Sequence, residues 1–153
     1  MRLLTPAAAS VFLALAFPLL TGVAAHAAVA CHKINAKGVG QDLGGGMTTA
    51  QIVGGGILHG STQGSFTITG GSAPVFLIGG TVTFTNDRGS LTVAVSGTFN
   101  VATGEFVAAG PVALSTGRLD GATGTLVLAG VQDLTNGKFV EEVTGLVCVD
   151  LAP

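Results

Sequence analysis

Short stretches in which apolar residues alternate with small polar ones recur along this chain and limit its fold more than any other feature. From Leu91 to Phe99 the odd-numbered positions are aliphatic or aromatic except for Gly97, whereas the even-numbered positions are small or polar. Alternation with a period of two residues is typical of a half-buried β-strand. Glycine-containing turns such as Asn86–Gly89 separate these stretches, and such turns favour β-hairpins. The pattern therefore predicts an all-β protein.

We expect about eight strands, near residues 29–35, 47–53, 57–69, 75–85, 91–99, 105–114, 125–131 and 138–149. The glycine-rich segment 36–46 is predicted to be a loop, and no segment after residue 28 keeps the helical period of 3.6. Eight antiparallel strands with short connections predict an up-and-down barrel, whose interior is either packed or holds one small ligand. A glycine-rich β-solenoid is the alternative that this composition allows.

The first 27 residues have the three parts of a secretory signal peptide. Arg2 supplies the positive charge, residues 11–20 form the apolar segment, and Ala25-His26-Ala27 provides a small-x-small cleavage site. We therefore expect cleavage after Ala27 and a single β-barrel domain at residues 28–153. The mature chain is then expected to lack a membrane span and to be secreted, periplasmic or associated with the cell envelope.

The two cysteines of the chain, Cys31 and Cys148, lie near the start and the end of the mature sequence. Because an exported protein meets an oxidising compartment, we predict a disulfide between them. It would join the first strand to the last and close a loop of about 117 residues, for which the chain-entropy model gives about 5 kcal/mol. The alternative is lipidation of Cys31, since residues 28–31 resemble a bacterial lipoprotein processing site.

Charge and aromatic content argue against a nucleic-acid partner and against an outer-membrane barrel. After residue 27 the chain has five basic and eight acidic residues, a net charge of −3. No basic patch is interleaved with aromatic residues, so nucleic acid is not an expected partner. The chain contains no Trp and no Tyr, which argues against an outer-membrane barrel with aromatic girdles. The sequence does not indicate an oligomeric state.

Two segments, residues 99–106 and 132–139, look like copies of one hairpin. In each, a turn ends in glycine and is followed by a charged residue and then by a phenylalanine, Phe106 or Phe139. The copies lie about 33 residues apart, which is the length of two strands with their loops. This spacing indicates repetition of a hairpin within one sheet.

The segment Ser115–Gly124 reads STGRLDGATG and leads into the apolar stretch 125–131. It resembles the G-T-G-x-F-x-G-A-x-G segment of the allene oxide cyclase and dirigent barrel superfamily. The resemblance implies an eight-stranded antiparallel barrel with an apolar interior. Ser115 replaces the usual glycine and Leu119 the usual aromatic residue, and the family's catalytic acidic, aromatic and asparagine residues have no counterpart here. The resemblance therefore implies a fold and no activity. The mature sequence is also similar to small, uncharacterised bacterial secreted proteins rich in glycine and threonine.

The sequence contains no motif for metal, cofactor or nucleophilic chemistry. His32 and His59 are the only histidines after residue 27, and a metal site needs three or four converging ligands. The chain has no nucleophile elbow, Walker loop or calcium loop, and the glycine triplets at 44–46 and 54–56 lack the Lys-Ser/Thr pair of a phosphate loop. We therefore expect no metal and no cofactor.

Glu141 and Glu142 are the most informative polar pair, because consecutive residues of a strand face opposite sides. One of them should point into the barrel, where an unpaired carboxylate is costly and needs a partner such as Arg118 or a wet interior. A bulge near Gly145 would instead place both outside. The candidate ligand-contacting residues are Glu141, Glu142, Arg118 and His59.

Three functions are compatible with this sequence. The first is a secreted or envelope-associated barrel without enzymatic activity that binds a small apolar molecule, and the lack of a catalytic motif favours it. The second is a cyclase-like or dirigent-like enzyme that uses a carboxylate in the interior, such as Glu141. The third is a structural or adhesive surface protein.

Overall fold

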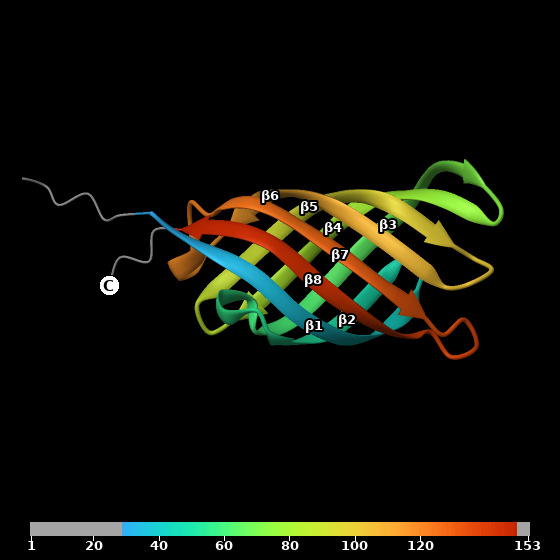
Figure 1. Ribbon diagram of the computed structural model, residues 1–153, viewed down its shortest axis with the longest axis horizontal. Coiled ribbons are helices and arrows are strands. Elements are labelled where there is room, and N and C mark those ends of the chain that lie inside the picture. The colour runs from blue at the N-terminus through green and yellow to red at the C-terminus, as the bar shows by residue number, and fades with distance from the viewer. Residues whose placement is uncertain (1–28, 150–153) are drawn as a thin grey trace, which may run out of the picture.

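Antiparallel pairing of each strand with its neighbour in sequence, and of the last strand with the first, builds a closed barrel (Figure 1). The computed structural model describes residues 29–149; the expected signal peptide and its cleavage site lie outside this range. The strands are β1 (Ala30–Gly44), β2 (Met47–Gly54), β3 (Gly60–Ser72), β4 (Val75–Asn86), β5 (Gly89–Asn100), β6 (Glu105–Ser115), β7 (Thr123–Gln132) and β8 (Lys138–Val149). The predicted eight-stranded up-and-down barrel is confirmed, and the solenoid alternative is excluded.

Strand β1 differs most from its prediction, because residues 36–44 extend the strand and do not form a loop. Gly38 and Gly40 lie on the face of β1 that points into the barrel, where side chains of β8 occupy the space that their own would need. A Cβ at Gly38 would lie 2.6 Å from Cγ of Glu141, and one at Gly40 would overlap the ring of Phe139. The glycines thus leave room in the interior, and β1 continues past them.

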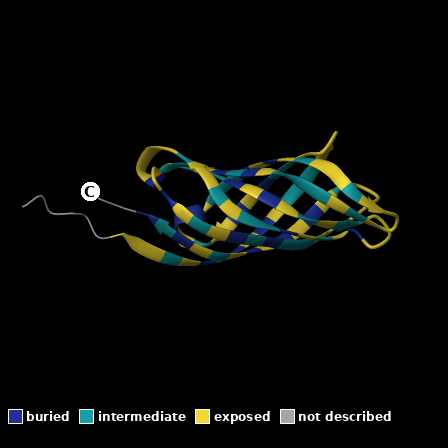
Figure 2. Ribbon diagram, turned by 90° about the horizontal axis from the view of Figure 1, so that it is seen from above, coloured by how far each residue is buried: buried dark blue, intermediate teal, exposed yellow. Residues whose placement is uncertain are grey.

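The barrel has two unlike ends. One end, which we call the sealed end, carries the β2–β3, β4–β5 and β6–β7 connections together with the start of β1 and the end of β8. The interior near this end is filled by side chains that are at most 1% exposed, including Ile34, Ile52, Phe84, Leu91, Val93, Leu126, Val147 and Val149. Figure 2 shows how buried and exposed residues alternate along the strands. The opposite, open end carries the other four turns.

Two short 3₁₀ helices close the sealed end. Helix η1 (Gly56–Leu58) contributes Ile57 and Leu58, which the sequence placed in a strand, and both are buried. Gly54 and Gly55, with φ of 77° and 71°, direct the chain inward in a left-handed conformation that side chains resist. The predicted start of the third strand is therefore wrong by three residues.

Helix η2 (Gly117–Leu119) lies within the Ser115–Gly124 turn. Leu119 is 1% exposed and belongs to the core. The backbone N–H of Ala122 donates to Oγ of Ser115 over 3.2 Å, so this serine side chain stabilises the turn. This segment acts as a cap on the core.

A disulfide between Cys31 and Cys148 joins β1 to β8 where the barrel closes. The two residues are direct partners in the strand register. The predicted pairing is confirmed, and with the sulfur of Cys31 bonded to Cys148 the lipidated alternative does not apply. Within residues 29–149, no helix has the length and apolar character needed to cross a membrane.

Candidate functional site

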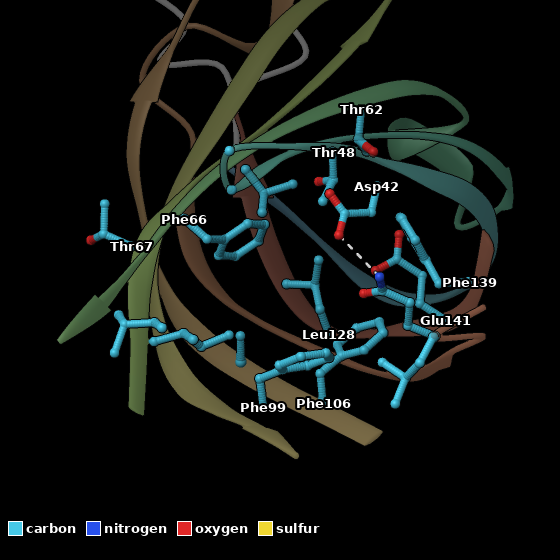
Figure 3. Close-up of a pocket in the computed structure, with 18 residues that line it drawn as sticks. Asp42, Thr48, Thr62, Phe66, Thr67, Phe99, Phe106, Leu128, Phe139 and Glu141 are labelled. Atoms are coloured by element: carbon cyan, nitrogen blue, oxygen red, sulfur yellow. Dashed lines mark hydrogen bonds between the residues drawn. The ribbon is translucent and has the colours of Figure 1, made fainter. Parts of the chain in front are cut away.

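A cavity of about 510 Å³ occupies the interior at the open end of the barrel. The packed core forms its floor, and glycines and Leu134 of the turns stand at its mouth. Eighteen residues from all eight strands and two of the turns line it (Figure 3). The charged or amide side chains among them are Asp42, Gln132 and Glu141. Cavities of this size hold small molecules in other proteins.

Four phenylalanines give the cavity its apolar character: Phe66 on β3, Phe99 on β5, Phe106 on β6 and Phe139 on β8. The rings of Phe106 and Phe139 meet edge to face, with centroids 5.8 Å apart and planes at 89°, an arrangement that aromatic pairs favour. Figure 3 shows the rings of Phe66, Phe99 and Phe106 around the same space.

The two hairpins that look like copies in the sequence deliver Phe106 and Phe139 to this site. In the first, the Gly104 N–H donates to the carbonyl of Asn100 over 2.8 Å; in the second, Gly137 donates to Asp133 over 2.7 Å. Both glycines have a left-handed φ, 77° and 73°. The charged residue after each glycine is exposed, and the phenylalanine that follows turns inward. The repeated hairpin in the sequence therefore marks both phenylalanines of the aromatic pair, although the sequence alone did not show that their rings are in contact.

Glu141 is the glutamate that points into the barrel. Its side chain is 8% exposed and lines the cavity, whereas Glu142 is exposed on the outer face. Strand β8 keeps one register with both β1 and β7 along its whole length, so no bulge at Gly145 moves the pair outward. The prediction that one of the two faces the interior is confirmed.

Glycines flank Glu141 on both neighbouring strands. Its register partners are Gly38 on β1 and Gly130 on β7, so no side chain stands directly beside it to neutralise its charge. Burial raises the pKa of Glu141 to about 7, and it is the only cause acting on this group, because a charged carboxylate is poorly solvated in an apolar interior. Glu141 is therefore ready to gain or lose a proton near neutral pH.

Asp42 and Gln132 form a polar pair near the mouth that the sequence did not single out. Nε2 of Gln132 donates to Oδ2 of Asp42 over 3.0 Å, and the Gly44 N–H donates to Oδ1 over 2.8 Å. The two residues are 90 positions apart, and only closure of β8 onto β1 brings β7 and β1 within reach. Both carboxylate oxygens of Asp42 therefore accept hydrogen bonds from within the protein.

The other two candidate residues do not belong to the cavity. Arg118 lies in η2 and His59 directly follows η1, so both are at the sealed end, and both are exposed. Of the two alternatives for the interior glutamate, a partner such as Arg118 or a wet interior, the first is therefore excluded for Arg118, because the packed core separates the two ends. Within residues 29–149, no group of three His, Cys, Asp or Glu side chains is arranged to hold a metal ion.

The chain matches no protein-family model, and no curated protein or solved structure matches it either. The barrel itself stands on the strand pairing described above, and the resemblance to the allene oxide cyclase and dirigent superfamily stays a prediction.

Proposed function

We propose that this chain is a binding protein that holds a small, largely apolar molecule in the cavity at the open end of its barrel. The observation that carries the proposal is the division of the interior: the sealed end is packed with aliphatic side chains, while the open end keeps about 510 Å³ lined by four phenylalanines. A barrel that served only as a scaffold would gain stability by filling this space, since apolar contacts are lost around a void.

The disulfide is consistent with an extracellular or periplasmic location. We further propose that the protein reaches this compartment by cleavage of its first 27 residues, and that it works there as a secreted or envelope-associated carrier or receptor. In such a setting a sealed floor and a single mouth protect an apolar ligand from water.

A neutral fluorescent probe tests binding directly. N-phenyl-1-naphthylamine is expected to brighten in the oxidised wild-type protein, since its rings leave water for the cavity. Ala108→Phe places a ring inside the cavity and should abolish the signal. Val107→Phe adds the same ring one residue away on the outer wall, where Val107 is 48% exposed, and should leave the signal unchanged.

Thr48→Phe places a ring in the same cavity from β2. It provides an independent test if Ala108→Phe does not fold. Circular dichroism establishes that each variant keeps its strands. A folded wild-type protein that leaves the probe dark, or a signal that survives both filling substitutions, would contradict the proposal.

One observation favours a second function, an enzyme that uses Glu141 for proton transfer. A pKa of about 7 in an apolar cavity is the property that suits a general acid or base. Chromatography of molecules that co-purify with the Glu141→Gln variant, with mass spectrometry for detection, separates the two functions. After incubation with the wild-type protein, the substrate of an enzyme changes its retention time even where proton transfer leaves its mass the same, whereas a binding protein returns the retained molecule unchanged.

A further inference from the structure

The charges that face the cavity are of one sign. Two of its eighteen lining residues are acidic, Asp42 and Glu141, and none is Lys, Arg or His. The basic residues nearest to them in sequence are Lys37 and Lys138, which are exposed, and Lys37 pairs in register with Glu142 on the outer face. An occupant of this cavity therefore meets negative charge and no positive charge from the lining.

The two acids differ in what already binds them. Both carboxylate oxygens of Asp42 accept hydrogen bonds, from Gln132 and from the backbone of Gly44. Glu141 is more than nine-tenths buried, and neither a hydrogen bond nor a nearby charge contributes to its pKa. Burying a carboxyl group without a partner costs free energy, so Glu141 is the group whose partner is to be sought in the occupant.

Glycines on both neighbouring strands let the side chains of Glu141 and Phe106 lie against the barrel wall, where both border the cavity. A Cβ at Gly38 would lie 2.7 Å from Oε1 of Glu141, and one at Gly130 would lie 2.6 Å from Cζ of Phe106. Gly130 is the register partner of both Phe106 and Glu141, so the carboxyl group and the Phe106–Phe139 pair border the same part of the lumen (Figure 3).

A carboxylate beside aromatic rings is the chemistry that recognises an organic cation. The carboxylate accepts charge-assisted hydrogen bonds from an ammonium group, and the negative faces of the rings attract the same charge. We propose that the occupant of the cavity is an apolar amine, whose protonated nitrogen pairs with Glu141 and whose hydrocarbon part packs against the phenylalanines. This inference rests on the proposed binding function and adds the chemical class of the ligand.

Three ligands with the same rings test the inference: 1-naphthylmethylamine, 1-naphthylmethanol and 1-naphthoate. At about pH 8 the amine is protonated and Glu141 is mostly ionised. Displacement of the neutral probe is expected to show the amine binding about ten-fold or more tighter than the alcohol, the value of one charge-assisted hydrogen bond, and the naphthoate binding weakest.

Glu141→Gln and Glu142→Gln are a matched pair, because they remove the same charge from consecutive residues on opposite sides of the wall. Glu141→Gln should remove the preference for the amine over the alcohol, since the amide keeps the shape of the side chain and loses its charge. Glu142→Gln should leave all three affinities unchanged.

The pH dependence supplies a second readout. Below about pH 7 Glu141 carries a proton that the amine must displace, so the affinity for the amine rises with pH and levels off above the pKa of Glu141. Asp42 is the other titratable group that lines the cavity. The remaining polar side chains of the lining, which belong to Gln132 and three threonines, do not titrate in this range. The affinity for the alcohol should stay flat over the same range.

Two results overturn the inference and are distinguishable from failure of the proposed function. An amine that binds no tighter than the alcohol, or a preference that survives Glu141→Gln, rejects the amine while the neutral probe still reports a binding cavity. Loss of all binding, including that of the neutral probe, rejects both.

Discussion

At the scale of single residues, the inward position of Glu141 depends on strand alternation and on the small residues beside it. Its exposed counterpart Glu142 shows that strand alternation alone assigns one carboxylate to each side of the wall. Two glycines across from Glu141 then make the inner position sterically acceptable, although nothing beside it makes that position electrostatically favourable. A buried acid with no protein partner costs stability, and such groups are candidates for functional sites.

Stability should fall as pH rises from about 4.5 to neutrality. The pKa of Glu141 is about 7 in the barrel and near its ordinary value of 4.5 when unfolded, so between these values the folded protein keeps a proton that the unfolded chain has lost. The contribution of Glu141 is therefore fully present below about pH 4.5, declines by about 3 kcal/mol between the two pKa values, and is lost above about pH 7.

Urea unfolding of the ligand-free protein between pH 4.5 and 8 measures this decline, and Glu141→Gln should flatten it. The pKa of Asp133 is lowered, chiefly by the hydrogen bond from Thr135, and its influence falls below this window. A wild-type protein that is equally stable throughout would show that Glu141 is solvated.

At the scale of strands and turns, alternation and turn chemistry predicted most of the barrel. Residues 138–149 were predicted with the bounds that β8 has, because Phe139, Val143, Val147 and Val149 recur there at even spacing and a glycine turn precedes them. Residues 36–44 were missed, because glycine within a strand looks like a loop until the side chains that fill its space are known. The direction of Glu141 and the meeting of Phe106 with Phe139 depend on how β8 pairs with β1 and β7, which no single segment encodes.

Gly38→Ala tests whether this space is needed. The new methyl group would meet Cγ and Oε1 of Glu141 and lie 3.0 Å from Cδ1 of Ile52, so we expect a loss of about 1–3 kcal/mol of unfolding free energy. The loss should shrink in the background of Glu141→Ala, which removes both glutamate atoms. Gly70→Ala is the control, since its nearest contact would be 3.4 Å from Leu77. An unchanged cost in the double variant would place the strain elsewhere.

At the scale of the whole molecule, the two ends of the barrel differ in how they are filled. The sealed end holds the core, both 3₁₀ helices and the disulfide, while the open end holds the cavity and the repeated hairpins. The division was not predictable from the sequence, which shows the same alternation at both ends. It arises from volume: aliphatic side chains and the inserted 3₁₀ residues fill one end, whereas a cavity of about 510 Å³ remains at the other. There Gly38, Gly40 and Gly130 let the side chains of Glu141, Phe139 and Phe106 lie against the wall.

The disulfide should stabilise the closure between β1 and β8. Replacing Cys31 and Cys148 with serine removes a link that spans 117 residues, and we expect a loss of about 2–5 kcal/mol of unfolding free energy. Denaturant unfolding measures the loss. Thiol titration of the unfolded, oxidised wild-type protein should find no free thiol, and two after reduction; two thiols without reductant would contradict the bond.

The register of β1 with β8 also gives the molecule a direction. Ala30 pairs with Val149, so the described chain enters and leaves the barrel side by side, at the end away from the mouth (Figure 1). A neighbouring domain, a tag or a solid support joined at either of these points is therefore attached at the sealed end of the barrel. The open end then faces the surrounding solution, and the attachment leaves the mouth of the cavity unobstructed.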